Sequence, residues 1–182
     1  MSFGIRRCAG DACRTMTVQI RNATDTDWPA IWPFFHDIVT AGETYAYDPD
    51  LTFEQARSLW MSPSSDPLSR TTVAIDADGT VLGSANMYPN RPGPGSHVAS
   101  ASFMVDSAAR GQGVGRLLCE DMIDWAGQEG FRAIQFNAVV ETNESAVHLW
   151  QELGFRIIGT VPEAFNHPKH GYVGLHVMHR AL

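Results

Sequence analysis

Glycine and arginine residues are concentrated in one short stretch whose composition suits anion binding. Gly111, Gly113 and Gly115 alternate with other residues, and Arg110 and Arg116 flank them. Because glycine has no Cβ, the backbone N–H groups of such a stretch can approach an anion closely. A helix that begins there would also direct the positive end of its dipole at the anion. The stretch therefore predicts a phosphate or pyrophosphate site.

Other interpretations of the glycine cluster remain open at this point. A glycine-rich connector that merely turns tightly has the same composition. The stretch lacks the Gly-Lys-Ser/Thr ending of nucleoside-triphosphate loops, and it does not follow the first strand as a dinucleotide-binding fingerprint does. These two nucleotide motifs are therefore disfavoured.

The elements around the glycines are predicted from hydrophobic spacing. A strand is expected over 97–105, and apolar residues at helical spacing predict a helix over 113–128 that ends at Gly130. A strand over 133–140 follows, and Asn143 is expected to cap another helix that stops at Gly154. The glycines are therefore expected to connect a strand to the start of a helix.

The remaining pattern predicts a mixed α/β domain over 16–182, with residues 1–15 as an N-terminal extension. Val18 and Ile20 alternate with polar residues as in a half-buried strand, and helices are expected from Thr24 to about Ala41 and from Thr52. Asp78-Gly79 predicts a hairpin between strands at 72–76 and 81–88, and the last strands are expected near 155–161 and 172–179.

Two motifs in this order resemble the GNAT superfamily of acyl-CoA-dependent N-acyltransferases. The family signature, Arg or Gln, two residues, Gly, one residue, then Gly or Ala, is matched by Arg110, Gly113 and Gly115. The helix start at 143–146 and the stretch 149–155 with its Gly-Phe ending are similar to the family's next motif. The resemblance implies a central twisted, mostly antiparallel sheet with splayed central strands and flanking helices. It also implies acetyl transfer, with the phosphinothricin or amino-acid acetyltransferases as one branch.

The resemblance implies acetyl-CoA as co-substrate and assigns residues to it. The pyrophosphate would lie on the glycine loop, and the pantetheine arm would pair with the strand at 103–105, where an N–H near Met104 would polarise the thioester carbonyl. The position of Trp150 often holds a tyrosine that protonates the leaving thiolate, which an indole cannot do. The implied coenzyme-binding residues are Phe103, Met104, Val105, Arg110, Gly111, Gln112, Gly113, Val114, Gly115, Arg116, Asn143 and Trp150.

Acyl transfer to an amine needs a proton acceptor, because an alkylamine with a reference pKa near 10 is mostly protonated at neutral pH. The candidates are Glu43, which follows the first helix where the family builds its acceptor pocket, His97 and, behind them, Tyr88. For Glu43 and His97, the alternative is a solvated loop residue or a hydrogen-bonded strand histidine.

The expected acceptor is a primary amine on a small molecule such as an amino acid, an amino-acid-like toxin or an antibiotic. The loops at 45–49 and 167–172 look able to close over the site, which favours a small acceptor. The alternatives are a protein or peptide N-acetyltransferase and a non-catalytic acyl-CoA sensor. Cys119 is predicted to be a core residue, so transfer should be direct within a ternary complex. The resemblance also allows a homodimer.

Composition disfavours several other classes of protein. The 13 Lys and Arg residues against 20 Asp and Glu residues give a net charge of −7, so no nucleic-acid partner is expected. No apolar run approaches the roughly 18 residues of a membrane span, and no signal sequence is evident. The three cysteines lack the spacing of a zinc site. Cys8 and Cys13 are expected to be free thiols in a reducing cytoplasm, and no metal is expected.

Overall fold

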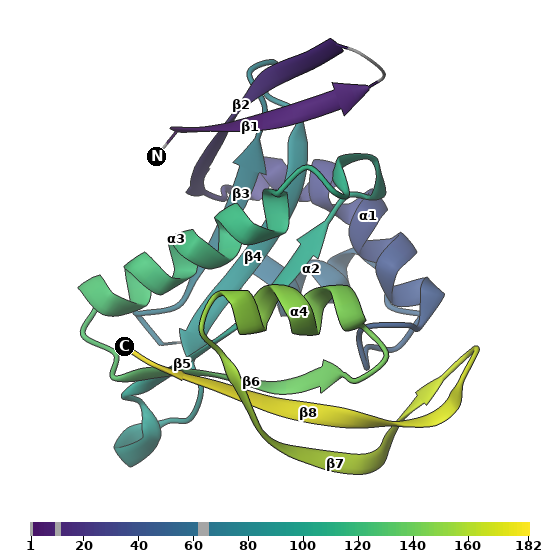
Figure 1. The fold of residues 1–182 in the computed structure, drawn as a ribbon, viewed down its shortest axis with the longest axis vertical. Helices are drawn as coiled ribbons and strands as arrows, with labels where there is room; N and C mark the ends of the chain where they lie inside the picture. The colour runs from purple at the N-terminus through teal and green to yellow at the C-terminus, as the bar shows by residue number, and fades with distance from the viewer. Residues whose placement is uncertain (1, 10–11, 62–65) are drawn as a thin grey trace.

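A single eight-stranded sheet forms the centre of the molecule (Figure 1). The computed structural model describes residues 2–9, 12–61 and 66–182, with side chains described from residue 17 onward. The expected free thiols of Cys8 and Cys13 lie outside the described side chains. The strands follow the order β1-β2-β3-β4-β5-β6-β8-β7. Their bounds are β1 Ser2–Ala9, β2 Ala12–Asn22, β3 Arg70–Ile75, β4 Val81–Pro89, β5 Val98–Val105, β6 Ala133–Val140, β7 Arg156–His167 and β8 Gly171–Ala181.

Helices cover both faces of the sheet (Figure 1). Helices α3 (Val114–Gln128) and α4 (Glu144–Glu152) pack on one face, where their apolar sides bury Leu118, Met122 and Trp150. Helices α1 (Trp28–Ala41) and α2 (Phe53–Met61) pack on the other. Short 3₁₀ turns lie at Asp25–Asp27, Gly93–Gly95 and Ser107–Ala109. The predicted mixed α/β architecture is confirmed.

The two ends of the chain both contribute strands to the sheet. Residues 1–15 were expected to be an N-terminal extension, and within this segment β1 pairs antiparallel with β2 and forms the edge of the sheet. Strand β7 continues beyond the expected end at residue 161 as far as His167. Its pairing with β8 shifts register between Val161 and Phe165, since Pro162 has no N–H to donate to the ladder.

The sheet opens at its centre, between β5 and β6. These strands form the one parallel pair of the sheet, and their pairing is confined to Val98 with Ala133 and Ala99 with Ile134. Beyond Ala99 the strands separate, as expected for splayed central strands. On its other side, β5 stays paired with β4 along its whole length, from Ala99 with Pro89 to Val105 with Gly83. One edge of β5 is therefore open over its second half.

Candidate active site

The alternation of strand pairing decides which backbone groups of β5 face the gap. Asp106 donates its N–H to Leu82 on β4, whereas the C=O of His97 accepts from Arg132 on the β6 side. Even-numbered residues of β5 therefore pair with β4, and odd-numbered residues direct their N–H and C=O toward the gap. Phe103 and Val105, which were expected to bind the pantetheine arm, belong to the set that faces the gap.

Met104 belongs to the other set, so its own N–H is not the one that faces the gap. Its position opposite Ser84 directs its backbone N–H toward β4, and its side chain is buried in the core beneath α1 and α2. The donor that the gap offers at this level is instead the N–H of Phe103. Which of the two N–H groups faces the gap follows from the alternation of backbone groups along β5, once its pairing with β4 is known.

A cavity of about 870 Å³ runs from the glycine loop (residues 110–115) through the gap to the loop after α1. Its walls come from both faces of the sheet, so two ligands could approach each other through the gap. Residues of β5, β6 and α4 line its middle. At the far end, which we call the acceptor end, the lining includes Glu43, Tyr45, Tyr88 and His167.

The glycine loop has the backbone geometry of an anion cradle. Gly111 and Gly113 have φ angles of 72° and 81°, which favour glycine, and a Cβ at Gly111 would meet nothing within 4 Å. Gly113 is the N-cap of α3 and carries no side chain that could cap it. The first amides of α3 have no intrahelical partner and line the cavity. The backbone geometry of the loop therefore fits an anion such as a diphosphate.

The polar side chains around the glycine loop differ in whether they are free to contact a phosphate. Arg110 is exposed, lines the cavity and makes no ion pair within the described part of the chain. Arg116 lines the cavity too, but it is paired with Glu152 and lies 3.9 Å from Glu120. Gln112 donates to the C=O of Ala108 and is not among the residues lining the cavity. Of these three side chains, Arg110 is the one free to neutralise a phosphate.

Two neighbouring polar residues at the start of α4 face the cavity. The side-chain oxygen of Asn143 accepts from the backbone N–H of Ala146, so this residue caps the helix as expected. Thr142, which sequence reasoning missed, also lines the cavity. Its hydroxyl is buried without a hydrogen-bond partner among the described residues. An unpaired buried hydroxyl needs a partner that the described residues do not supply, so Thr142 is a candidate ligand contact.

Trp150 forms the wall between the two separated strands. Its ring centroid lies 5.0 Å from that of Phe103 on β5 and 5.3 Å from that of Phe136 on β6. The side chain is buried, so Trp150 belongs to the core and to the cavity wall at once. It supplies no acidic hydroxyl there.

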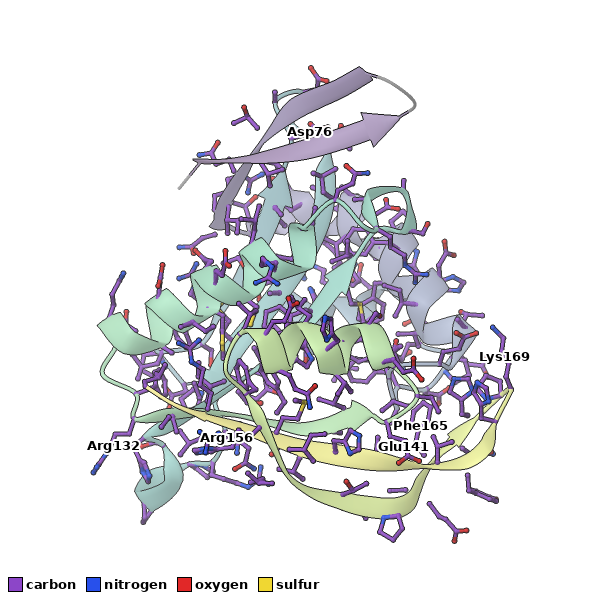
Figure 2. All side chains as sticks on the ribbon, in the orientation of Figure 1. Asp76, Arg132, Glu141, Arg156, Phe165 and Lys169 are labelled. Atoms are coloured by element: carbon purple, nitrogen blue, oxygen red, sulfur yellow. The ribbon has the colours of Figure 1, made fainter. Side chains whose placement is uncertain are left out.

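An ion pair joins two distant segments at the acceptor end. Lys169, at the tip of the β7–β8 hairpin (Figure 2), contacts the carboxylate of Glu43. This contact lowers the pKa of Glu43, with smaller contributions in the same direction from the charges of His167 and Arg110. His167 is buried, and its Nδ1 accepts the backbone N–H of Lys169. The segment after α1 therefore meets the loop at 167–172, one of the two loops expected to close over the site.

Tyr45, an aromatic residue of the acceptor end, was not predicted from the sequence to be a site residue. The Tyr45 hydroxyl donates to the C=O of Phe103 at 2.7 Å and accepts its N–H at 3.0 Å. Burial raises the pKa of Tyr45, so this phenol stays neutral at physiological pH. Tyr88 lines the cavity as well.

His97 is not brought to the cavity. It lies before β5, at the end of the strand where β5 and β6 are still paired, and it is exposed. Its Nδ1 is 3.1 Å from the C=O of Pro94. The position suits a surface turn residue better than a proton relay at the gap.

The described residues contain neither a metal-binding cluster nor a membrane-spanning helix. Among them, no group of three or more His, Cys, Asp or Glu side chains is placed to hold a metal ion. Cys119 on α3 is buried in the core, and burial raises the pKa of its thiol. Within the same residues, no helix has the length and apolar character needed to cross a bilayer.

The sequence matches a known family model over most of its length. The model described as the acetyltransferase (GNAT) family covers residues 20–155. Among curated proteins, the N-acetyltransferase aca1 of Schizosaccharomyces pombe is 29% identical over 156 residues, which are 79% of this chain and 75% of that protein.

Solved structures agree with this match. A GCN5-related N-acetyltransferase from Kribbella flavida is 81% identical, with a TM-score of 0.87 over 91% of this chain and 98% of the other. A phosphinothricin acetyltransferase from Sinorhizobium meliloti, solved in complex with AcCoA, has a TM-score of 0.79 over 91% of this chain and 88% of the other. At 22% identity, the second likeness concerns the fold alone.

Proposed function

We propose that this chain, which belongs to the GNAT acetyltransferase family and is an acyltransferase, transfers acetyl from acetyl-CoA to a primary amine of a small molecule. The observation that carries the proposal is the continuity of one cavity from the uncapped glycine loop, through the gap, to a polar acceptor end. Such a cavity lets a phosphate-bearing thioester and an amine meet at the open edge of β5.

The coenzyme is assigned to the loop, the edge of β5 and the start of α4. The amides of Gly111, Gly113 and Gly115 and the guanidinium of Arg110 would hold the phosphates. The backbone groups of Val105 and the C=O of Phe103, which face the gap, would pair with the arm as an added strand, with Thr142 and Asn143 on the opposite wall. When bound, the thioester supplies an activated acyl group, and the Phe103 N–H is aimed to stabilise the oxyanion that forms on it.

A small acceptor is supported by the way in which the far end is covered. The Glu43–Lys169 ion pair joins the loop after α1 to the β7–β8 hairpin over the cavity. A Cβ on Gly42 would lie 3.9 Å from the side-chain ring of Pro168, so the Gly42 backbone and the hairpin are also close together here. A long peptide would have to separate them, whereas a small amine would not.

Glu43 is the group proposed to receive the acceptor's ammonium and its proton. The lowered pKa keeps the carboxylate ionised, which favours binding of a cation but weakens it as a base. A water relay that includes the Tyr88 hydroxyl at the same end would carry the proton from the amine. Because Trp150 provides no acid, the thiolate must leave without a proton from α4, as a thiol with a reference pKa near 8.5 permits.

The proposal is tested by thiol release from acetyl-CoA across a panel of amines. The panel pairs free amino acids and small primary amines with peptides that carry the same amino groups. We expect turnover with members of the small-amine set and rates at least about tenfold lower with the matched peptides. Turnover with peptides alone would assign the chain to the peptide-acetylating class, and coenzyme binding without turnover of any amine would contradict the proposal.

A further inference from the structure

The Tyr45 hydroxyl lies at the point where the two proposed ligands must meet. Tyr45 comes from the loop after α1 and packs with the aromatic core on that face of the sheet. Its hydroxyl nevertheless bonds the N–H and the C=O of Phe103, whose backbone groups face the gap. The glycine loop belongs to the opposite face, with α3. Tyr45 therefore reaches the gap from the acceptor side.

These two hydrogen bonds replace a missing sheet neighbour. Because pairing with β6 stops at Ala99, the N–H and C=O of Phe103 have no strand partner on that side. Unpaired backbone groups away from water are costly, so a donor-and-acceptor hydroxyl is well suited to satisfy both of them. A thioester arm lying along β5 would require the same two groups. One N–H cannot make good hydrogen bonds to both acceptors at once.

We propose that Tyr45 is a positioning residue whose hydroxyl occupies the thioester's place on Phe103 and is exchanged for the acyl arm when the coenzyme binds. The inference rests on the proposed coenzyme site and adds a residue to it. The hydroxyl keeps the N–H of Phe103 aimed into the gap in the free protein. The same hydrogen bonds oppose binding of the arm, but they do not oppose binding of the phosphates.

The surroundings of Tyr45 allow this exchange. The residue lies in an irregular stretch between α1 and α2, three residues after Gly42, which is in the left-handed conformation. Its ring stacks on that of Tyr47, with centroids 5.5 Å apart, which holds the ring while the hydroxyl changes partner. Ser102 lies close enough for its hydroxyl to affect the pKa of Tyr45. Ser102 is thus an alternative partner on the acceptor side of the gap.

The test compares two ligands and two variants by calorimetric titration. Tyr45→Phe removes the hydroxyl and keeps the ring, and Tyr47→Phe is the control, because its hydroxyl has no bond to Phe103. Acetyl-CoA carries the arm, and 3′-phospho-ADP is the same nucleotide without it. We expect Tyr45→Phe to bind acetyl-CoA about three- to tenfold more tightly than wild type, the range set by one ordinary hydrogen bond. Its affinity for 3′-phospho-ADP should be unchanged, and Tyr47→Phe should alter neither.

A second readout follows the Phe103 amide by NMR. In the free protein, the amide proton should exchange with solvent faster in Tyr45→Phe than in wild type, and acetyl-CoA should protect it in both. Equal or weaker acetyl-CoA binding by a folded Tyr45→Phe variant would overturn the exchange. Failure of wild type to bind 3′-phospho-ADP would instead overturn the phosphate loop, so the two failures are distinguishable.

Discussion

The two ends of the cavity are built from different parts of the chain. The proposed coenzyme end consists mostly of backbone groups from one continuous segment, the turn between β5 and α3, with Arg110 beside it. The acceptor end consists of side chains from segments far apart in sequence, which are already paired with each other as Glu43 with Lys169 and Tyr45 with Phe103. The first end is shaped for one fixed anion, whereas the second can change with the side chains that line it.

The largest expected effect tests whether the backbone of the loop is the coenzyme site. Gly113→Asp places a side chain at a φ of 81° and a negative charge where the phosphates are expected. Acetyl-CoA affinity should fall more than roughly 1000-fold, from strain combined with like-charge repulsion. Gly79→Asp is a matched control, since Gly79 has a φ of 83° in the β3–β4 turn. Equal acetyl-CoA affinities of Gly113→Asp and Gly79→Asp would contradict the assignment of the glycine loop as the coenzyme site.

The next effect tests the acceptor end by itself. Glu43→Gln removes the carboxylate but keeps the shape of the side chain, so turnover should fall roughly 100-fold, as expected for loss of a proton acceptor. Affinity for acetyl-CoA should stay within about twofold, because a neutral amide at this distance from the phosphates removes no contact to them. Steady-state kinetics measures turnover and titration measures acetyl-CoA affinity. Asp37→Asn, at an exposed position of α1, is the control. Wild-type turnover would eliminate Glu43 from the mechanism.

A smaller effect separates two arginines within the coenzyme end. Arg110 has no ion pair among the described residues, whereas Arg116 is held by Glu152. Arg110→Gln should therefore weaken acetyl-CoA binding about tenfold, and Arg116→Gln no more than about threefold, on the scale of a charge-assisted hydrogen bond. Titration at fixed ionic strength gives both values. The reverse order would mean that Arg116 exchanges Glu152 for phosphate.

The smallest effect concerns pH. Lys169 lowers the pKa of Glu43, so the ionised form persists to lower pH than an unpaired glutamate would allow. Activity that needs this carboxylate is present above its pKa and is lost as pH falls through it. Lys169→Met raises the pKa toward its ordinary value, so the acid limb of the kcat/KM profile should move to higher pH. Lys169→Arg retains the charge and should leave the acid limb in place. Coincident kcat/KM profiles for wild type and both variants would mean that the acid limb does not report the ionisation of Glu43.

The difference between the two ends also explains how much the sequence could predict. The glycine spacing, the helix after it and the cap at Asn143 are local features, because each depends on residues within a few positions. The first helix likewise ends at Ala41 as expected, with Gly42 after it in the left-handed conformation. Local patterns therefore located most of the elements and the glycine loop that we propose as the coenzyme site.

Features that depend on pairing between distant strands could not be predicted from the sequence. The choice of Phe103 over Met104 as the inward N–H depends on the β4–β5 register, which no local pattern reports. The Tyr45–Phe103 and Glu43–Lys169 contacts join residues widely separated in the chain. His97 was a candidate because a strand was expected to begin there, but β5 begins at Val98 and the gap opens only beyond Ala99. The strand expected near 155–161 continues through a register shift as far as His167, which no local pattern indicated.

A crystal structure with acetyl-CoA bound tests the central claim most directly. We expect diphosphate oxygens within about 3.2 Å of the amides between Gly111 and Gly115, and the thioester carbonyl at the same distance from the N–H of Phe103. The Tyr45 hydroxyl should then have left that N–H. A coenzyme whose phosphates lie away from the loop, or whose arm lies outside the gap between β5 and β6, would contradict the account.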